Sequence, residues 1–192
     1  MEHTAPDLGF WLRLSLTHGV GRDSARRLLA AFNDPANIFS QTAVQLCQVV
    51  SAPQAQALLQ KPPGLDELLE DTQAWLQTSP NPEVSRAVIT LGDALYPAAL
   101  LDTPDPPLML YALGQTQALQ HFQHERAVAM VGSRNPTPQG AENARAFACS
   151  LAASGLTVVS GLALGVDGAA HEGALQGAIQ SGLHAGGSAP LA

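Results

Sequence analysis

The chain has 192 residues, of which 46% are hydrophobic and 13% charged, a balance typical of a folded protein with one core or two small domains. The formal net charge of -7 excludes a broadly basic nucleic-acid coat, so any contact with phosphates must come from a local patch. Cys47 and Cys149 lack the spacing of a zinc site or a redox pair, and the N-terminus lacks the pattern of a secretory signal; we therefore expect a cytoplasmic protein with reduced thiols.

The first part of the chain, residues 7 to about 78, is predicted to be helical. Its apolar residues recur at spacings of three and four, which is typical of helices with one buried face. The run Thr78-Ser79-Pro80-Asn81-Pro82 then disfavours a continuing helix. We expect a helical domain over residues 1–80, of the helix-hairpin-helix or SAM-like kind.

A Gly-Val-Gly turn separates two of these predicted helices. Gly19 and Gly21 would allow a tight turn, and the free N–H groups at the start of the next helix could hold one DNA phosphate without reading sequence. Arg22 and Arg26 would add positive charge there. A plain pair of helices joined by glycines explains the same residues equally well, so both interpretations stay open.

Beyond the linker, short apolar strands alternate with helices, a pattern typical of a parallel α/β sheet. Strands are predicted at 87–90, 107–111, 127–131 and 156–160. Thr137 and Pro138 can begin the helix between the last two strands, which completes a right-handed strand-helix-strand unit. We expect an incomplete Rossmann-like sheet over residues 81–178 and a disordered tail over 179–192, where Gly, Ser, Ala and Pro predominate.

Two loops of this α/β part point to an anion site. Gly132, Ser133 and Arg134 follow one predicted strand, and Ser160 and Gly161 follow the next. Ligands of such sheets bind beyond the carboxyl ends of the strands, so the two loops are expected to converge on one crevice. The forked guanidinium of an arginine suits phosphate oxygens, which predicts a site for a phosphate backbone or a nucleotide.

The sequence offers little support for catalysis. The dinucleotide fingerprint and the Walker loop are both missing, which disfavours nicotinamide and ATP as cofactors. Asp167 and His171 stand four residues apart on one helix face, but an aspartate at a helix start held by a neighbouring histidine explains them better than a metal or acid-base pair. We predict no catalytic residue, no metal ligand and no cofactor.

Taken together, the motifs at 130–134, 137–140 and 159–171 resemble those of the DNA-processing protein A family (DprA, also called Smf). Tyr96-Pro97, Asp105-Pro106-Pro107 and Gly114 are similar to that family's lead-in to its Rossmann-like domain. The resemblance covers most of the chain up to about Gly177. It implies a cytosolic, dimeric protein that is not an enzyme, binds and protects single-stranded DNA during natural transformation, and helps to load the recombinase RecA.

The resemblance also implies roles for individual residues. The family's Gly-Ser-Arg phosphate contact falls here on Gly132, Ser133 and Arg134. Its second loop motif falls on Ser160, Gly161 and Gly165. After Gly177 the chain departs from the family pattern, which would continue with another strand and a further loop, so we expect a chain truncated within the Rossmann-like domain. An inactive truncation is one interpretation of this ending.

Two other classes of function stay open. One is a nucleotide-processing enzyme resembling the cytokinin-activating phosphoribohydrolases, although their Pro-Gly-Gly-x-Gly-Thr-x-x-Glu stretch is missing and no positioned carboxylate replaces it. The other is a helix-hairpin-helix DNA module whose α/β part is only structural.

Overall fold

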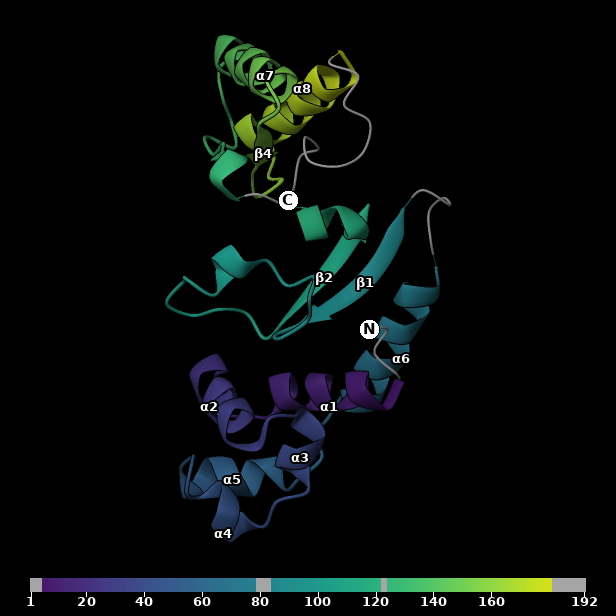
Figure 1. Cartoon of the computed structure of the whole chain (residues 1–192), viewed down its shortest axis with the longest axis vertical. Coiled ribbons are helices and arrows are strands. Elements are labelled where there is room, and N and C mark those ends of the chain that lie inside the picture. Colours follow the sequence, from purple (N-terminus) through teal and green to yellow (C-terminus); the bar gives the residue numbers. More distant parts are fainter. Residues whose placement is uncertain (1–4, 79–83, 122–123, 181–192) are drawn as a thin grey trace. The chain divides into compact units, whose positions relative to one another are not determined.

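The computed structural model describes residues 5–78, 84–121 and 124–180, and it divides into two compact units, Met1–Thr116 and Gln117–Ala192 (Figure 1). The helical character expected of the first part and the α/β character of the second are both present. None of the helices within these described ranges is long and apolar enough to cross a membrane.

Short helices make up the first part of unit 1: α1 (Ala5–Leu16), α2 (Arg22–Phe32), α3 (Pro35–Phe39), α4 (Ala43–Leu46), α5 (Ala52–Leu58) and α6 (Leu65–Gln77). Side chains that cap the first turn mark where some of these helices begin. Asp34 accepts a hydrogen bond from Ala36 N at 2.7 Å, and Thr42 forms a capping box with Gln45. Fully buried leucines and an isoleucine, among them Leu14, Leu28 and Ile38, form the core between these helices.

Strands β1 (Ser85–Thr90) and β2 (Met109–Gly114) pair antiparallel, with Ser85 opposite Gly114 and Thr90 opposite Met109. The expectation that they belong to one parallel sheet was wrong. A parallel pair needs a crossover, usually a helix, but the segment between these strands contains four prolines and forms only the short 3-10 helix η1 (Ala98–Leu100).

This hairpin belongs to the same unit as the helices. Leu108 is buried in the main helical core, and Val88 and Met109 pack against Leu8, Leu12 and Leu65. The division between the units falls after Thr116, and the domain boundary that the sequence predicts near residue 80 lies in a segment outside the described residues.

In unit 2, the 3-10 helix η3 (His124–Arg126) leads into β3 (Ala127–Ala129), followed by α7 (Pro138–Ala153), β4 (Thr157–Val159) and α8 (Val166–Gln180). Strands β3 and β4 pair parallel, with Val128 opposite Val158, as the strand-helix-strand pattern predicted. Ile179 and Gln180 are still helical, so the predicted tail does not begin at 179. The rest of that tail lies outside the described residues.

Helices α7 and α8 lie side by side over the small sheet (Figure 1). Their closest approach is at two glycines of α8: a Cβ at Gly173 would lie 2.0 Å from the carbonyl oxygen of Arg145, and one at Gly177 2.1 Å from that of Cys149. Because only glycine leaves this space, the helix backbones can touch there. Small buried side chains, including Ala148, Ala152, Ala170 and Ala174, fill the rest of the contact, with Val158 below.

Candidate phosphate-binding site

The candidate site lies where β3 and β4 end. The two parallel strands finish at the same edge of the sheet, and Met130 N still donates a hydrogen bond to Val159 O at 2.9 Å. The loop after β3 carries Gly132, Ser133 and Arg134, and the loop after β4 carries Ser160 and Gly161. The structure thus brings both predicted loops to one edge, as their positions after parallel strands indicate.

The two loops are also joined directly by their backbones. Val166 N, at the start of α8, donates a hydrogen bond to Ser133 O at 3.0 Å. Gly165 has a φ of 88°, and a Cβ there would lie only 2.3 Å from Ser133 O. A Cβ at Gly132 would lie 2.9 Å from the side chain of Val166. Glycine is therefore required at Gly165, both for its backbone conformation and for its contact with the first loop.

The first loop is held by local hydrogen bonds that leave its side chains exposed. Asn135 N donates to Ser133 Oγ at 3.1 Å, and Thr137 caps α7 by accepting from Gly140 N at 3.1 Å. Pro138 occupies the first turn of α7, as predicted. Arg134 is exposed and, among residues 5–78, 84–121 and 124–180, has no carboxylate within ion-pair distance. Its guanidinium is therefore available to an external anion.

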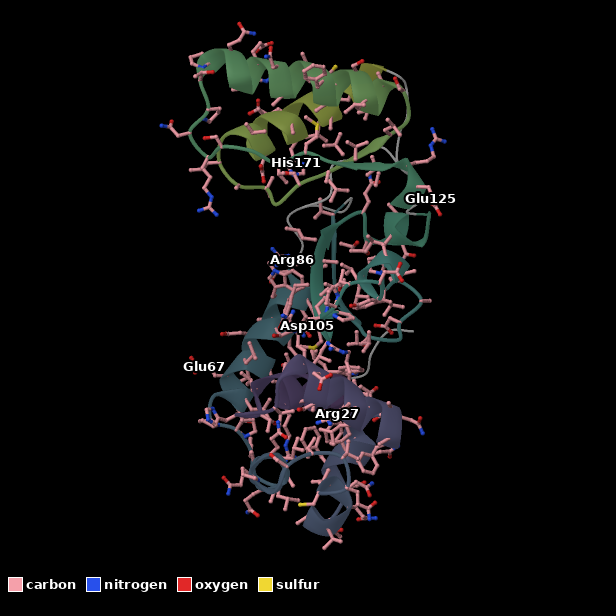
Figure 2. The ribbon with its side chains drawn as sticks, turned by 90° about the vertical axis from the view of Figure 1, so that its left-hand side faces the viewer. Arg27, Glu67, Arg86, Asp105, Glu125 and His171 are labelled. Atoms are coloured by element: carbon pink, nitrogen blue, oxygen red, sulfur yellow. The ribbon has the colours of Figure 1, made fainter. Side chains whose placement is uncertain are left out.

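The second loop is held from inside the unit by His171 (Figure 2). Ser160 Oγ lies 2.9 Å from His171 Nε2, and Leu162 N donates to the same Oγ at 3.3 Å. The hydroxyl and the ring nitrogen can each donate or accept, so the tautomer of His171 sets the direction of this hydrogen bond. Burial lowers the pKa of His171 and favours the neutral ring, against the opposing effects of the Asp167 carboxylate and of a hydrogen bond with the backbone of Ser160.

The sequence does not predict this contact, because its spacing pairs Asp167 with His171 and places Ser160 in a loop. Asp167 is buried at the start of α8 and acts electrostatically on His171, but the hydrogen bond of His171 goes to Ser160. Nothing in the spacing of Ser160 and His171 signals their contact. The side chain of Ser160 is buried and holds the loop, whereas Ser133 and Arg134 of the first loop are exposed to solvent.

A serine beside a neutral histidine can also act as a nucleophile with its base. Here Ser160 and His171 are each only 6% exposed, so a substrate has no access to the hydroxyl. In the described part of the chain, no group of three or more His, Cys, Asp or Glu residues is placed to hold a metal ion. The contact between Ser160 and His171 therefore supports the second loop.

Comparison with known proteins identifies a family whose sequence model includes these loops. The sequence model of the family described as DNA recombination-mediator protein A matches residues 87–187, a range that contains both loops. The chain belongs to this family. It is 35% identical over 174 residues to Protein Smf of Escherichia coli (strain K12), covering 88% of this chain and 42% of Smf.

Other members of the family agree with this assignment. DNA processing protein DprA of Bacillus subtilis (strain 168) is 33% identical over 88 residues, which are 46% of this chain and 29% of that protein. The fold is similar to the X-ray structure of DprA from Streptococcus pneumoniae, with a TM-score of 0.60 and 23% identity over 92% of this chain and 56% of that one. The chain thus spans less than half the length of the curated relatives it matches.

The second predicted DNA contact, at the turn from Gly19 to Gly21, lies in unit 1. The turn joins α1 to α2, and Gly19 has a φ of 76°. The carbonyl oxygen of Gly19 accepts a hydrogen bond from Gln54 Nε2 at 2.8 Å. Val20 is buried and Gly21 is the N-cap of α2. A tight glycine turn is present, as both interpretations of the motif required.

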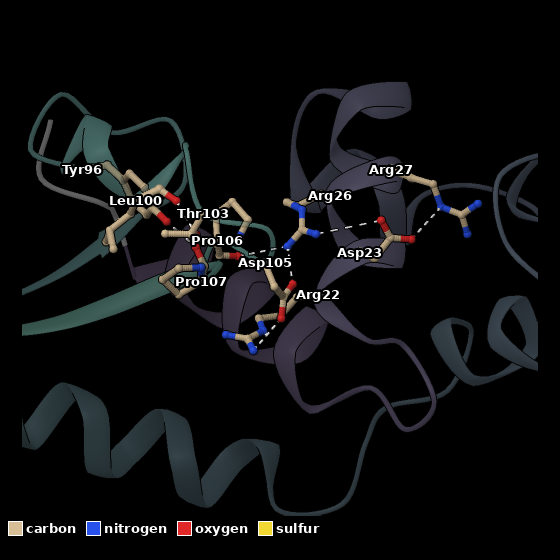
Figure 3. Close-up of polar contacts among 10 residues, drawn as sticks. All are labelled: Arg22, Asp23, Arg26, Arg27, Tyr96, Leu100, Thr103, Asp105, Pro106 and Pro107. Carbon is tan, nitrogen blue, oxygen red and sulfur yellow. Dashed lines mark hydrogen bonds and ion pairs between the residues drawn. The ribbon is translucent and has the colours of Figure 1, made fainter.

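The arginines after this turn are engaged by Asp105 (Figure 3). Arg22 Nη2 lies 2.5 Å from Asp105 Oδ2, and Arg26 Nη1 lies 2.7 Å from Oδ1 and also donates to Pro106 O at 3.1 Å. The hydrogen bond from Arg26 is the main reason that the pKa of Asp105 is lowered. Sequence alone gave no sign of this cluster, because Arg26 and Asp105 are 79 residues apart.

Proposed function

We propose that the chain binds single-stranded DNA through phosphate contacts at the two loops of unit 2, as a DNA-processing protein of natural transformation. The observation that carries this proposal is the exposed guanidinium of Arg134, without a carboxylate partner in the described residues, on a loop fixed by the hydrogen bond from Val166 N to Ser133 O. Gly132 and Ser133 would contribute backbone and hydroxyl donors beside it, and Gly161 and Gly165 would contribute through the backbone of the second loop, which Gly165 holds against the first.

The charge of the chain is compatible with such a site. A net charge of -7 opposes general attraction to DNA, so binding would depend on local contacts at the edge of the sheet. Arg145, farther along α7, is held in ion pairs by Glu142 and Glu172, at 2.8 and 2.7 Å. Arg134 is therefore the arginine of this edge whose removal should matter most.

Several wider roles are part of the proposal. The family description refers to recombination mediation, and the relatives in Bacillus subtilis and Streptococcus pneumoniae are named DNA processing protein DprA. We propose on this basis a cytoplasmic protein that protects incoming DNA, helps to load the recombinase RecA onto it and, like the full-length members of its family, forms a homodimer. It would act by binding, not as an enzyme.

The test compares two arginines of unit 2. Arg134→Ala should weaken binding of a single-stranded oligonucleotide of any sequence and reduce the salt slope of the binding constant by about 0.7, because one phosphate contact is lost. Arg134→Lys should recover part of the affinity, since an ammonium group cannot make the forked contact. Binding is measured by fluorescence anisotropy at several salt concentrations.

Arg126→Ala is the matched control, because it removes the same charge from the opposite end of β3. It should leave both the affinity and the salt slope unchanged. If the two variants behave alike, phosphate binding does not take place at the Arg134 loop.

A further inference from the structure

Unit 1 contains a small groove that the family resemblance does not explain. Its volume is about 200 Å³, and the residues around it include Val20, Arg22, Leu108, Met109 and Tyr111. Val20 and Leu108 are buried and form an apolar floor, whereas Arg22 and Tyr111 are about half exposed and flank it. The groove is smaller than a site for a whole drug-sized ligand, so it suits one flat group of a larger molecule.

The ring of Tyr111 is fixed in place beside this groove. Its hydroxyl lies 2.9 Å from Thr72 Oγ1, and its ring meets that of Trp75 edge-on, with centroids 5.4 Å apart and planes at 67°. Arg86 supports Trp75 in turn, with its guanidinium 5.2 Å from the Trp75 ring centroid and Nη1 donating to Trp75 O. Tyr111 is 49% exposed, and because these contacts hold its ring, the ring loses little freedom when another ring stacks on it.

Arg22 is fixed on the other flank by the ion pair with Asp105 (Figure 3). The surrounding cluster contains three arginines, Arg22, Arg26 and Arg27, against the carboxylates of Asp23 and Asp105. One positive charge is left over, and the Arg22 side chain is 54% exposed. The groove thus joins an apolar floor and an aromatic wall to a cationic rim, which is the combination that holds a base and its neighbouring phosphate in single-strand binding proteins.

We propose that this groove receives one base of a bound single-stranded DNA, which stacks on Tyr111 while Arg22 contacts the adjacent phosphate. The inference rests on the proposed function, since it assumes single-stranded DNA as the ligand. It assigns a binding role to unit 1 that is separate from the Arg134 loop. In this proposal, DNA contacts unit 1 at a base-binding groove next to the turn at Gly19 and Gly21, and not at a phosphate site in the turn itself.

Photocrosslinking tests this directly in the full 192-residue chain. An oligothymidylate with a single 5-iodouracil is bound and irradiated, and the modified peptide is identified by mass spectrometry. We expect the crosslink at Tyr111. Tyr111→Leu should abolish it and weaken binding at least about fivefold, as loss of one stacked base does.

Matched variants separate stacking from folding. Tyr111→Phe keeps the ring and loses only the bond to Thr72, so it should retain the affinity and the crosslink to the groove. Leu113→Ala removes another exposed apolar side chain from β2, two residues along, and should change neither. Arg22→Gln should weaken binding without preventing stacking. Each variant is compared with the wild type by its thermal unfolding curve.

The outcomes distinguish the two proposals. If the wild type binds the oligonucleotide but crosslinks only near Arg134, and Tyr111→Leu binds as well as the wild type, the base-binding groove is wrong and the proposed function stands. If the wild type does not bind single-stranded DNA, both are wrong. If Tyr111→Leu weakens binding while Arg134→Ala does not, the groove is confirmed and the Arg134 site is wrong.

Discussion

His171 is the residue on which the second loop of unit 2 depends, and its protonation should be visible in the stability of that unit. Burial lowers the pKa of His171 below the ordinary value of 6.5, so the unfolded chain takes up a proton more readily than the folded one. By linkage, this histidine's contribution to the free energy of unfolding is present above pH 6.5 and is lost as the pH falls below that value. The neutral ring that lies beside Ser160 is the form that is lost.

We therefore expect the free energy of unfolding of unit 2 to be lower at about pH 5.5 than at about pH 7.5. Urea unfolding followed by circular dichroism at the two pH values measures this. His171→Gln keeps a polar group near Ser160 but does not titrate, so the difference between the two pH values should shrink in that variant. An equal pH dependence in wild type and variant would assign the effect to other groups.

At the scale of elements, the contact between α7 and α8 sets the shape of unit 2. Gly173 and Gly177 allow the backbones to touch, so a methyl group at Gly173 would push the helices apart. Gly173→Ala should lower the free energy of unfolding by about 1–3 kcal/mol, the usual effect of overpacking. Gln176→Ala, on the exposed side of the same helix, should have little effect.

Thiol labelling checks this expectation, because Cys149 lies half-buried in α7 at the contact with Gly177. In a Cys47→Ser background, Gly173→Ala should increase the rate at which Cys149 reacts, whereas Gln176→Ala should not. If Gly173→Ala labels as slowly as the parent chain, the helices have not moved apart and the expectation is wrong.

The elements also show how far the sequence could predict the fold and the site. The convergence of the Gly132 and Ser160 loops was predictable, because parallel strands end at one edge whatever their side chains. The antiparallel pairing of β1 and β2 was not, since an apolar strand does not reveal its direction and the proline-rich connection had to be recognised as lacking a crossover helix. Contacts such as Ser160 with His171 depend on tertiary packing and leave no periodic signal.

At the scale of the whole molecule, the division after Thr116 changes what an independent fragment should be. A fragment ending at residue 78 would lack Leu108, which is buried in the helical core, and Met109, which packs against it. Loss of one buried leucine side chain costs about 2–5 kcal/mol. We expect residues 1–116 to unfold cooperatively and residues 1–78 to be less stable by at least that amount.

Thermal unfolding of the two fragments tests this expectation, with Leu108→Ala in the longer fragment as the matched control. The variant should lie between the two fragments in stability. Equal melting of residues 1–78 and 1–116 would show that the hairpin is not needed by the helices.

Because Trp75 lies against Tyr111, the fluorescence of Trp75 can be used to follow binding at the groove. Trp11 and Trp75 are the two tryptophans of the sequence, and both belong to unit 1, one in the helical core and the other beside the groove. We therefore expect tryptophan fluorescence to change with events in unit 1 and not with events confined to the Arg134 loop. A nucleobase arriving at Tyr111 would change the surroundings of Trp75 and alter its emission. One spectrum of the unlabelled chain can thereby distinguish occupancy of the groove from occupancy of the sheet edge.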